Sequence, residues 1–128
     1  MNDELLAEAA AAAENAYSPY SDFRVGAVVV TGDGSRFVGV NVENAAYGST
    51  QCAEATAMAN AVTAGHTDID TIAVVGIDAE GECYPCGNCR QMMRELGVAT
   101  VIVRTPEGKA RQHTLEELLP HSFGPESL

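Results

Sequence analysis

Tryptophan is absent from this sequence, and aromatic residues make up only 5% of it. A core must therefore be built largely from Ala, Val, Leu and Ile. The apolar share of 46% is nevertheless typical of a globular chain and excludes a disordered one. A chain of 128 residues has the length of one ordinary domain and buries a core without needing disulfides. We therefore expect a single domain over residues 1–128.

Basic residues are also scarce. Seven Lys and Arg face eighteen Asp and Glu, which gives a formal net charge of -11. Such a surface repels a polyanion unless its few cations cluster. The composition thus argues against nucleic-acid polymers and anionic membranes as partners. It is compatible with a small neutral ligand and with a bound metal ion.

The sequence shows neither a basic leader nor a long apolar run. Its first four residues include two acids, whereas a signal peptide starts with basic residues. The alanine run at 9–13 is short and bounded by Glu8 and Glu14, which favours an amphipathic helix over a membrane span. We therefore expect a cytoplasmic protein. In that reducing compartment the four cysteines are expected to be thiols or metal ligands rather than disulfides.

Hydrophobic periodicity and turn residues predict elements in the order α-β-β-α-β-α-β-β-α. We expect helices over residues 3–16, 52–64 and 86–96 and a short one after 114, with strands over 23–30, 36–42, 71–77, 100–104 and 109–113. The turns at 32–34 and 106–108 predict two antiparallel pairs. Strand–helix–strand crossovers surround the two middle helices. The expected class is α/β, with a single mixed five-stranded sheet sandwiched by helices.

Three cysteines fall at predicted helix starts. Cys86 and Cys89 are spaced C-x-x-C directly after Pro85, so both sulfurs can meet one metal ion from a single helical turn. Cys52 opens the other helix, and both helices follow strands that end at the same edge of the predicted sheet. A helix N-terminus favours the thiolate form of cysteine. Three thiolates predict a zinc site with its fourth position open, as in catalytic zinc sites.

Glu54 lies two residues after Cys52, in the same predicted first turn. A carboxylate there can take a proton from water and return it to a substrate. Glutamate is common in the first turn of any helix, so this position alone carries no weight. It gains weight from the cysteines around it.

Two other interpretations of the cysteines remain open. C-x-x-C alone is also typical of a redox pair or of a structural zinc clip. A redox pair leaves Cys52 and Glu54 unexplained, and a clip needs a fourth ligand. Cys83 is the candidate for that ligand, although an ordinary buried thiol is the favoured interpretation. As a ligand, Cys83 would close the site and exclude catalysis.

In its motifs the sequence resembles the small, homotetrameric, zinc-dependent cytidine deaminases. The match runs over nearly the whole chain and includes FRVGA at 23–27, NVENAAYG at 41–48, CAE at 52–54 and PCGNCRQ at 85–91. The last two segments fit the zinc-deaminase signature in the version with cysteine in place of histidine. Such a set in one order and spacing is specific.

The resemblance implies hydrolysis of cytidine and 2′-deoxycytidine to uridine and 2′-deoxyuridine with release of ammonia, as in pyrimidine salvage. One zinc ion per subunit would be held by Cys52, Cys86 and Cys89, and Glu54 would be the catalytic proton carrier. A related enzyme for another aminopyrimidine nucleoside, such as a blasticidin-type antibiotic, stays open as an alternative. So does a non-enzymatic, zinc-stabilised binding module.

The resemblance also implies a substrate pocket. Asn41 and Glu43 would hydrogen-bond the ribose hydroxyls, and the backbone at Ala53 would read the edge of the pyrimidine. Phe23 would pack against the pyrimidine ring, although a strand aromatic often serves only the core. Tyr47 and Phe123 would reach into a neighbouring subunit's pocket in the tetramer, with packing inside their own chain as the alternative.

This sequence departs from the pattern at two positions. Many relatives carry Arg directly after the catalytic Glu, whereas this chain has Ala55. Arg90 and the helix dipoles are then expected to offset the negative charge of the thiolates. Arg24 stands where relatives often have Pro. Because Arg24 is next to Phe23, we expect it to alter the mouth of the pocket.

Overall fold

The computed structural model describes residues 1–128 and contains the elements in the expected order. They are α1 (Asn2–Ala13), β1 (Val25–Thr31), β2 (Arg36–Val40), the 3-10 turn η1 (Tyr47–Ser49), α2 (Ala53–Thr63), β3 (Ile69–Gly76), α3 (Gly87–Glu95), β4 (Thr100–Arg104), β5 (Ala110–Thr114), α4 (Leu115–Leu118) and the 3-10 turn η2 (Pro125–Ser127). None of the helices combines the length and the apolar character needed to span a bilayer.

The five strands form one mixed sheet in the order β2-β1-β3-β4-β5, which confirms the predicted class. β3 and β4 are parallel, and the other three neighbouring pairs are antiparallel. Both predicted hairpins are therefore present. Because β2 and β3 are each antiparallel to β1, they run in the same direction. Their carboxyl ends lie at one edge of the sheet, and the segments leading to α2 and α3 start from that edge.

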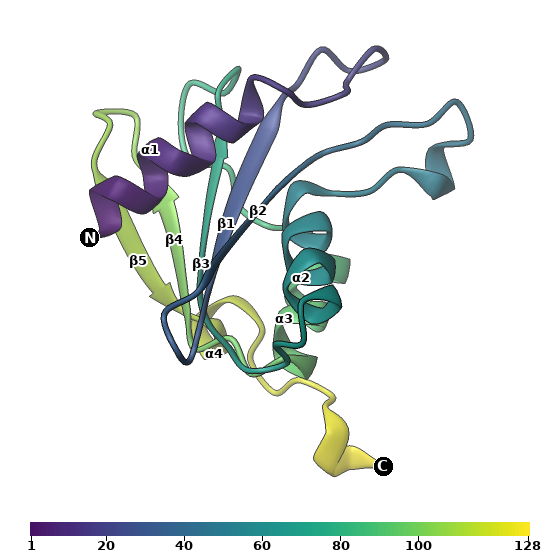
Figure 1. The fold of residues 1–128 in the computed structure, drawn as a ribbon, viewed down its shortest axis with the longest axis vertical. Coiled ribbons are helices and arrows are strands. Elements are labelled where there is room, and N and C mark those ends of the chain that lie inside the picture. Colours follow the sequence, from purple (N-terminus) through teal and green to yellow (C-terminus); the bar gives the residue numbers. More distant parts are fainter.

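Helices cover both faces of the sheet (Figure 1). On one face α1 buries Leu5, Leu6 and Ala9 against Val28 and residues of β3 and β4. On the other face α2 and α3 pack on the alternate side chains of the same strands, in a larger cluster that includes Met58 and Met93. The alternation along each strand thus divides the apolar residues between two cores.

Several predicted boundaries were wrong by a few residues. The first helix ends at Ala13 rather than at residue 16, and the second strand ends at Val40 rather than at residue 42. The chain after Val40 leaves the regular ladder, and Val42 forms isolated bridges with Tyr17 and Gln51. The short helix α4 begins with a capping box, in which Thr114 and Glu117 satisfy each other's backbone N–H groups.

Candidate metal centre and active site

The sulfur atoms of Cys52, Cys86 and Cys89 lie together between the first turns of α2 and α3. Their sulfur atoms are all within 4.8 Å of one another, and those of Cys52 and Cys86 are 3.9 Å apart. Two sulfurs bound at 2.3 Å to one tetrahedral zinc ion are about 3.8 Å apart. The three thiols therefore fit a zinc ion with little movement.

The two helices begin at their cysteines. Cys52 is the N-cap of α2 and Cys86 is the N-cap of α3, both with extended backbone and neither with a side-chain cap hydrogen bond. Ser, Thr, Asp and Asn are the residues that normally stabilise this position. A cysteine at the N-cap lacks that stabilising hydrogen bond. Its sulfur is therefore available to another partner, next to the free N–H groups of the helix.

The cluster favours a thiolate at Cys52. The Cys89 and Cys86 thiols donate to its sulfur and lower the pKa of Cys52 to about 6, against the effect of its partial burial. The same hydrogen bond, together with burial, raises the pKa of Cys89. The cluster therefore favours the thiolate at Cys52, and a divalent cation would draw off the remaining thiol protons.

Glu54 is buried in the first turn of α2, with only 5% of its surface exposed. Burial raises the pKa of Glu54 to about 7, and the negative charge of Cys52 adds to this rise. A carboxyl group with a pKa near neutral can both accept and return a proton at physiological pH. The expected proton carrier therefore has a suitable pKa and lies beside the cysteine cluster.

One cavity of about 190 Å³ joins these groups. It is lined by Val25, Asn41, Thr50, Gln51, Cys52, Ala53, Glu54, Cys83, Tyr84 and Cys86. A larger hollow of about 410 Å³ lies at the opposite edge of the sheet, around residues 67–70 and 95–97. It holds acids but no cysteine or histidine. Chemistry rather than volume therefore identifies the smaller cavity as the candidate site.

Asn41 reaches this cavity from the end of β2 and is held by the start of β1. Its Oδ1 accepts from the Val25 N–H at 2.9 Å, and its Nδ2 donates to the Phe23 carbonyl at 2.8 Å. These two bonds distinguish the oxygen of the side-chain amide from its nitrogen. The side-chain amide of Asn41 has two donor hydrogens and two acceptor lone pairs. One donor hydrogen and one lone pair therefore remain for a ligand.

Glu43 lies in an adjacent hollow rather than in the same one. That hollow of about 360 Å³ also contains Tyr20, Ser21, Asn44, Tyr47 and Thr50, and Thr50 is shared with the first cavity. The Glu43 carboxylate accepts from the N–H groups of Tyr20 and Ser21 and from the Ser21 hydroxyl. The hydrogen bond from Ser21 lowers the pKa of Glu43, so the group is ionised.

Comparison with known proteins agrees with this chemistry. Residues 1–105 match the model of the cytidine and deoxycytidylate deaminase zinc-binding region. A cytidine deaminase from Halalkalibacterium halodurans is 45% identical over 97% of this chain and 95% of its own length. One from Sporosarcina psychrophila is 42% identical over 98% and 93%. The crystal structure of cytidine deaminase from Burkholderia pseudomallei superposes with a TM-score of 0.89 at 46% identity, covering 96% of this chain and 99% of the other.

The chain belongs to the cytidine and deoxycytidylate deaminase family. It is accordingly a zinc protein, and its cluster of three cysteines lies within the matched region and is positioned to hold the ion.

Cys83 is not part of that cluster. It lines the cavity as a half-buried thiol, and burial, followed by the charges of Glu54 and Cys52, raises the pKa of Cys83 to about 11. A family member with three thiolate ligands does not need a fourth. The ordinary interpretation of Cys83 as a buried thiol is the one that the geometry favours.

Replacing Cys83 by Ser is therefore expected to leave the zinc content at one ion per chain and the activity within about twofold of the original. Cys86→Ser, in contrast, removes one of three clustered sulfurs and should lower the zinc affinity by at least about tenfold. Zinc titration of both purified variants with a chromogenic chelator measures this. Loss of zinc from the Cys83 variant would instead indicate a closed structural site.

Phe23 lies outside the cavity in this family member. Its ring covers Gly76 in β3, where a Cβ would come within 2.9 Å of the Phe23 Cζ, and it packs against the larger core. The structure therefore gives Phe23 a core role, and a role against the pyrimidine stays a prediction. Its carbonyl, by contrast, contacts Asn41 directly.

Tyr47 and Phe123 are both on segments that project from the body of the fold (Figure 1). Tyr47 is 77% exposed in η1, with its ring edge-on to Tyr20 at 6.1 Å between centroids. Phe123 is 60% exposed, and only its backbone carbonyl is tied down, by the Gln91 amide. Packing inside their own chain does not cover these two rings.

Arg90 in α3 binds backbone rather than sulfur. Its Nε donates to the Pro85 carbonyl at 2.8 Å and an Nη donates to the Leu118 carbonyl at 2.7 Å. The side chain thus fastens the segment before Cys86 to the end of α4. Its charge is on the helix that carries Cys89, while Ala55 is buried in the first turns of α2 and supplies none.

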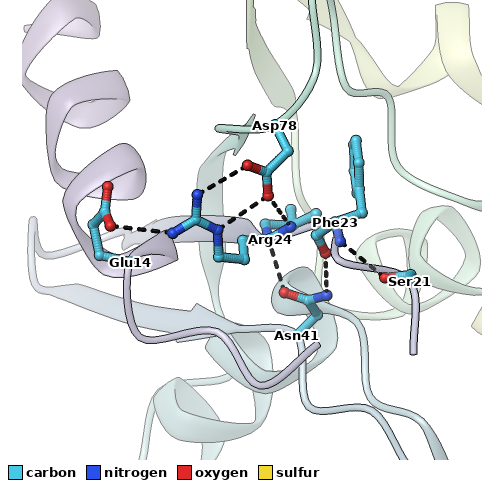
Figure 2. Close-up of polar contacts among 7 residues, drawn as sticks. Glu14, Ser21, Phe23, Arg24, Asn41 and Asp78 are labelled. Atoms are coloured by element: carbon cyan, nitrogen blue, oxygen red, sulfur yellow. Dashed lines mark hydrogen bonds and ion pairs between the residues drawn. The ribbon is translucent and has the colours of Figure 1, made fainter. Parts of the chain in front are cut away.

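Arg24 is not among the residues that line the cavity, and its effect on the mouth of the pocket stays a prediction. Its guanidinium makes a two-pronged contact with Asp78, at 2.9 and 3.1 Å, and a further contact with Glu14 at 3.3 Å (Figure 2). Asp78 lies just after the end of β3 and was not among the site residues predicted from the sequence. No local pattern marks it, because its partner is 54 residues away in the sequence.

Proposed function

We propose that this chain is a zinc-dependent cytidine deaminase, which hydrolyses cytidine and 2′-deoxycytidine to uridine and 2′-deoxyuridine and releases ammonia. The observation that carries this proposal is the cluster of three sulfurs beside the buried carboxyl of Glu54, in one small cavity. The relatives named above are cytidine deaminases, and they match the chain over nearly its full length.

Cys52, Cys86 and Cys89 are the residues that would hold the zinc ion, each through its thiolate. Bound there, the ion supplies a Lewis acid that makes water a better nucleophile near neutral pH. Three thiolates carry more negative charge than the ion neutralises. The free N–H groups at the starts of α2 and α3, and the charge of Arg90, offset the excess.

Glu54 would carry the protons. It takes one from the water that adds to C4 of the pyrimidine and delivers it to N3. It then helps the second proton reach the amino nitrogen, which leaves as ammonia while the oxygen stays on C4. A carboxyl group with a pKa near 7 is protonated and deprotonated with almost equal ease, which suits both steps.

The nucleoside would be held by groups at the ends of β2 and α2. Asn41 lines the cavity, and the donor and acceptor that its two hydrogen bonds leave unused would suit a ribose hydroxyl. Glu43, in the neighbouring hollow, would accept from a second hydroxyl. The backbone at Ala53, which lines the cavity at the start of α2, would read the edge of the pyrimidine. A contact of Phe23 with the ring also stays part of the proposal, although its side chain does not line the cavity.

A homotetramer of such chains in the cytoplasm, acting in pyrimidine salvage, completes the proposal. The exposed rings of Tyr47 and Phe123 support it, since aromatic side chains on projecting segments are typical of interface contacts. Light scattering on the purified protein tests it, because a tetramer has four times the mass of the 13.4 kDa chain. A mass of one chain would exclude a role for these rings in a neighbour's pocket.

The first test is ammonia release from cytidine by the zinc-loaded protein. Release at ordinary enzyme rates, about 1 to 10³ per second, is the expected result. Zinc-loaded protein that leaves cytidine and 2′-deoxycytidine intact would contradict the proposal. Activity on another aminopyrimidine nucleoside would then indicate a related deaminase, and inactivity on all of them a structural zinc site.

A further inference from the structure

The peptide group between Phe23 and Arg24 is held at both ends. Its carbonyl oxygen accepts from the Asn41 side-chain amide at 2.8 Å, and its N–H donates to the Asp78 carboxylate at 2.8 Å (Figure 2). A trans peptide group is planar, with its C=O and N–H on opposite edges. Asp78 and Asn41 therefore hydrogen-bond opposite sides of one rigid peptide group.

We infer that Asp78 is a positioning residue for substrate binding, which orients Asn41 through this peptide group. The inference rests on the proposed function, because it takes Asn41 to contact the nucleoside. Asp78 itself lies outside the residues that line the cavity, so it does not touch the ligand. Its effect on substrate binding is transmitted through the peptide group between Phe23 and Arg24.

Asp78 is itself well fixed. The Arg24 guanidinium binds both of its carboxylate oxygens, and a backbone bond from the Ile77 N–H to the Arg24 carbonyl joins the same two segments. The hydrogen bond from the Arg24 side chain, followed by that from its backbone N–H, lowers the pKa of Asp78 to about 2. The group is therefore a carboxylate, and only an acceptor, at any pH at which the enzyme works.

An ionised acceptor on the N–H strengthens the bond at the other end of the same peptide group. It polarises the group and makes the Phe23 carbonyl a better acceptor for the Asn41 amide. That amide also accepts from the Val25 N–H, so its orientation is fixed by two bonds. Asn41 then presents its remaining donor and acceptor in one fixed arrangement, with no rotation to be lost when the nucleoside binds.

Steady-state kinetics with cytidine test the inference on the zinc-loaded enzyme. Asp78→Ala should raise KM by about fivefold to tenfold, which corresponds to one hydrogen bond, with kcat within about twofold. Asp78→Asn keeps an acceptor for the Arg24 N–H and should restore most of the affinity. Glu14→Ala is the matched control, because Glu14 contacts the Arg24 guanidinium but not the peptide group, and it should leave KM unchanged. An unchanged KM in Asp78→Ala would overturn the inference.

A double-mutant cycle with Asn41→Ala separates positioning from general damage. If Asp78 acts through Asn41, adding Asp78→Ala to the Asn41 variant should change kcat/KM by less than about twofold. If the double variant instead shows the product of the two single-variant losses in kcat/KM, Asp78 acts independently of Asn41. That result would overturn the inference and leave the deaminase function standing.

Hydrogen exchange at the Val25 amide gives a readout that needs no turnover. This N–H donates to Asn41 Oδ1, so its exchange rate rises when the Asn41 side chain is less firmly fixed. We expect Asp78→Ala to speed its exchange by about tenfold and Glu14→Ala to leave it unchanged. If the protein does not deaminate cytidine at all, this measurement still decides the structural link, and equal exchange in both variants refutes it.

Discussion

Replacing Glu54 by Gln is expected to lower kcat for cytidine by about 10³-fold or more, while the protein keeps one zinc ion per chain. Gln has nearly the shape of Glu but cannot accept and return a proton. The substitution therefore removes proton transfer and leaves the volume of the buried side chain unchanged. Zinc content and ammonia release, measured on the same preparation, check both halves of this expectation.

Stability provides a second signature of the same change. A carboxyl group that is 5% exposed and has a pKa of about 7 is destabilised by burial in its charged form. Above pH 7 the apo protein must either bury that charge or hold a proton against the bulk pH. The neutral amide of Gln avoids both, so the apo variant should be at least as stable as the original at pH 8.

A matched control is Glu80→Gln, which makes the same chemical change on an exposed turn. It should leave activity, zinc content and melting temperature as they are. If Glu54→Gln retained more than about a tenth of the activity, another group would have to carry the protons.

Local patterns were sufficient to predict the elements and their arrangement. Glycines in the 32–34 and 106–108 turns predicted the two hairpins, and the strand–helix–strand order around the two middle helices predicted one mixed sheet. From that arrangement followed the meeting of Cys52 with Cys86 and Cys89, since helices that follow parallel strands start at the same edge. These predictions needed only neighbouring residues and the rules of strand connection.

Contacts of side chains with distant backbone could not be predicted in this way. Asn41 binds Val25 in β1 and Phe23 just before it, across 16 and 18 residues of sequence, and Asp78 binds Arg24 across 54. Nothing in the composition of either segment distinguishes such a contact from a solvated polar residue. Arg24 is an example. The expectation that it affects the pocket mouth came from Phe23, its neighbour in sequence, whereas its side chain binds Asp78 and Glu14, which are distant in sequence.

Gly39→Ala is expected to destabilise the fold and to disable the site at once. Gly39 lies in β2 against the backbone of α2, where a Cβ would clash with the Ala57 nitrogen and come within 2.6 Å of the Ala53 carbonyl. Backbone atoms inside a helix cannot turn aside as a flexible side chain can. The helix must move outward as a unit, and overpacking of this kind costs about 1–3 kcal/mol or more in the free energy of unfolding. Urea titration of the zinc-free protein measures that loss.

The same movement reaches the chemistry because α2 begins with Cys52 and carries Glu54 in its first turn. A misplacement of about 1 Å lowers the activity of a positioned catalytic group by about 10²-fold. We therefore expect the folded fraction of Gly39→Ala to bind zinc more weakly and to deaminate cytidine about 10²-fold more slowly. Gly81→Ala is the control, since its Cβ meets only a Pro106 side-chain atom at 3.6 Å. A stable Gly39 variant with full activity would mean that α2 can move away from the sheet without disturbing the cysteine cluster, and that the close approach at Gly39 does not set the position of Glu54.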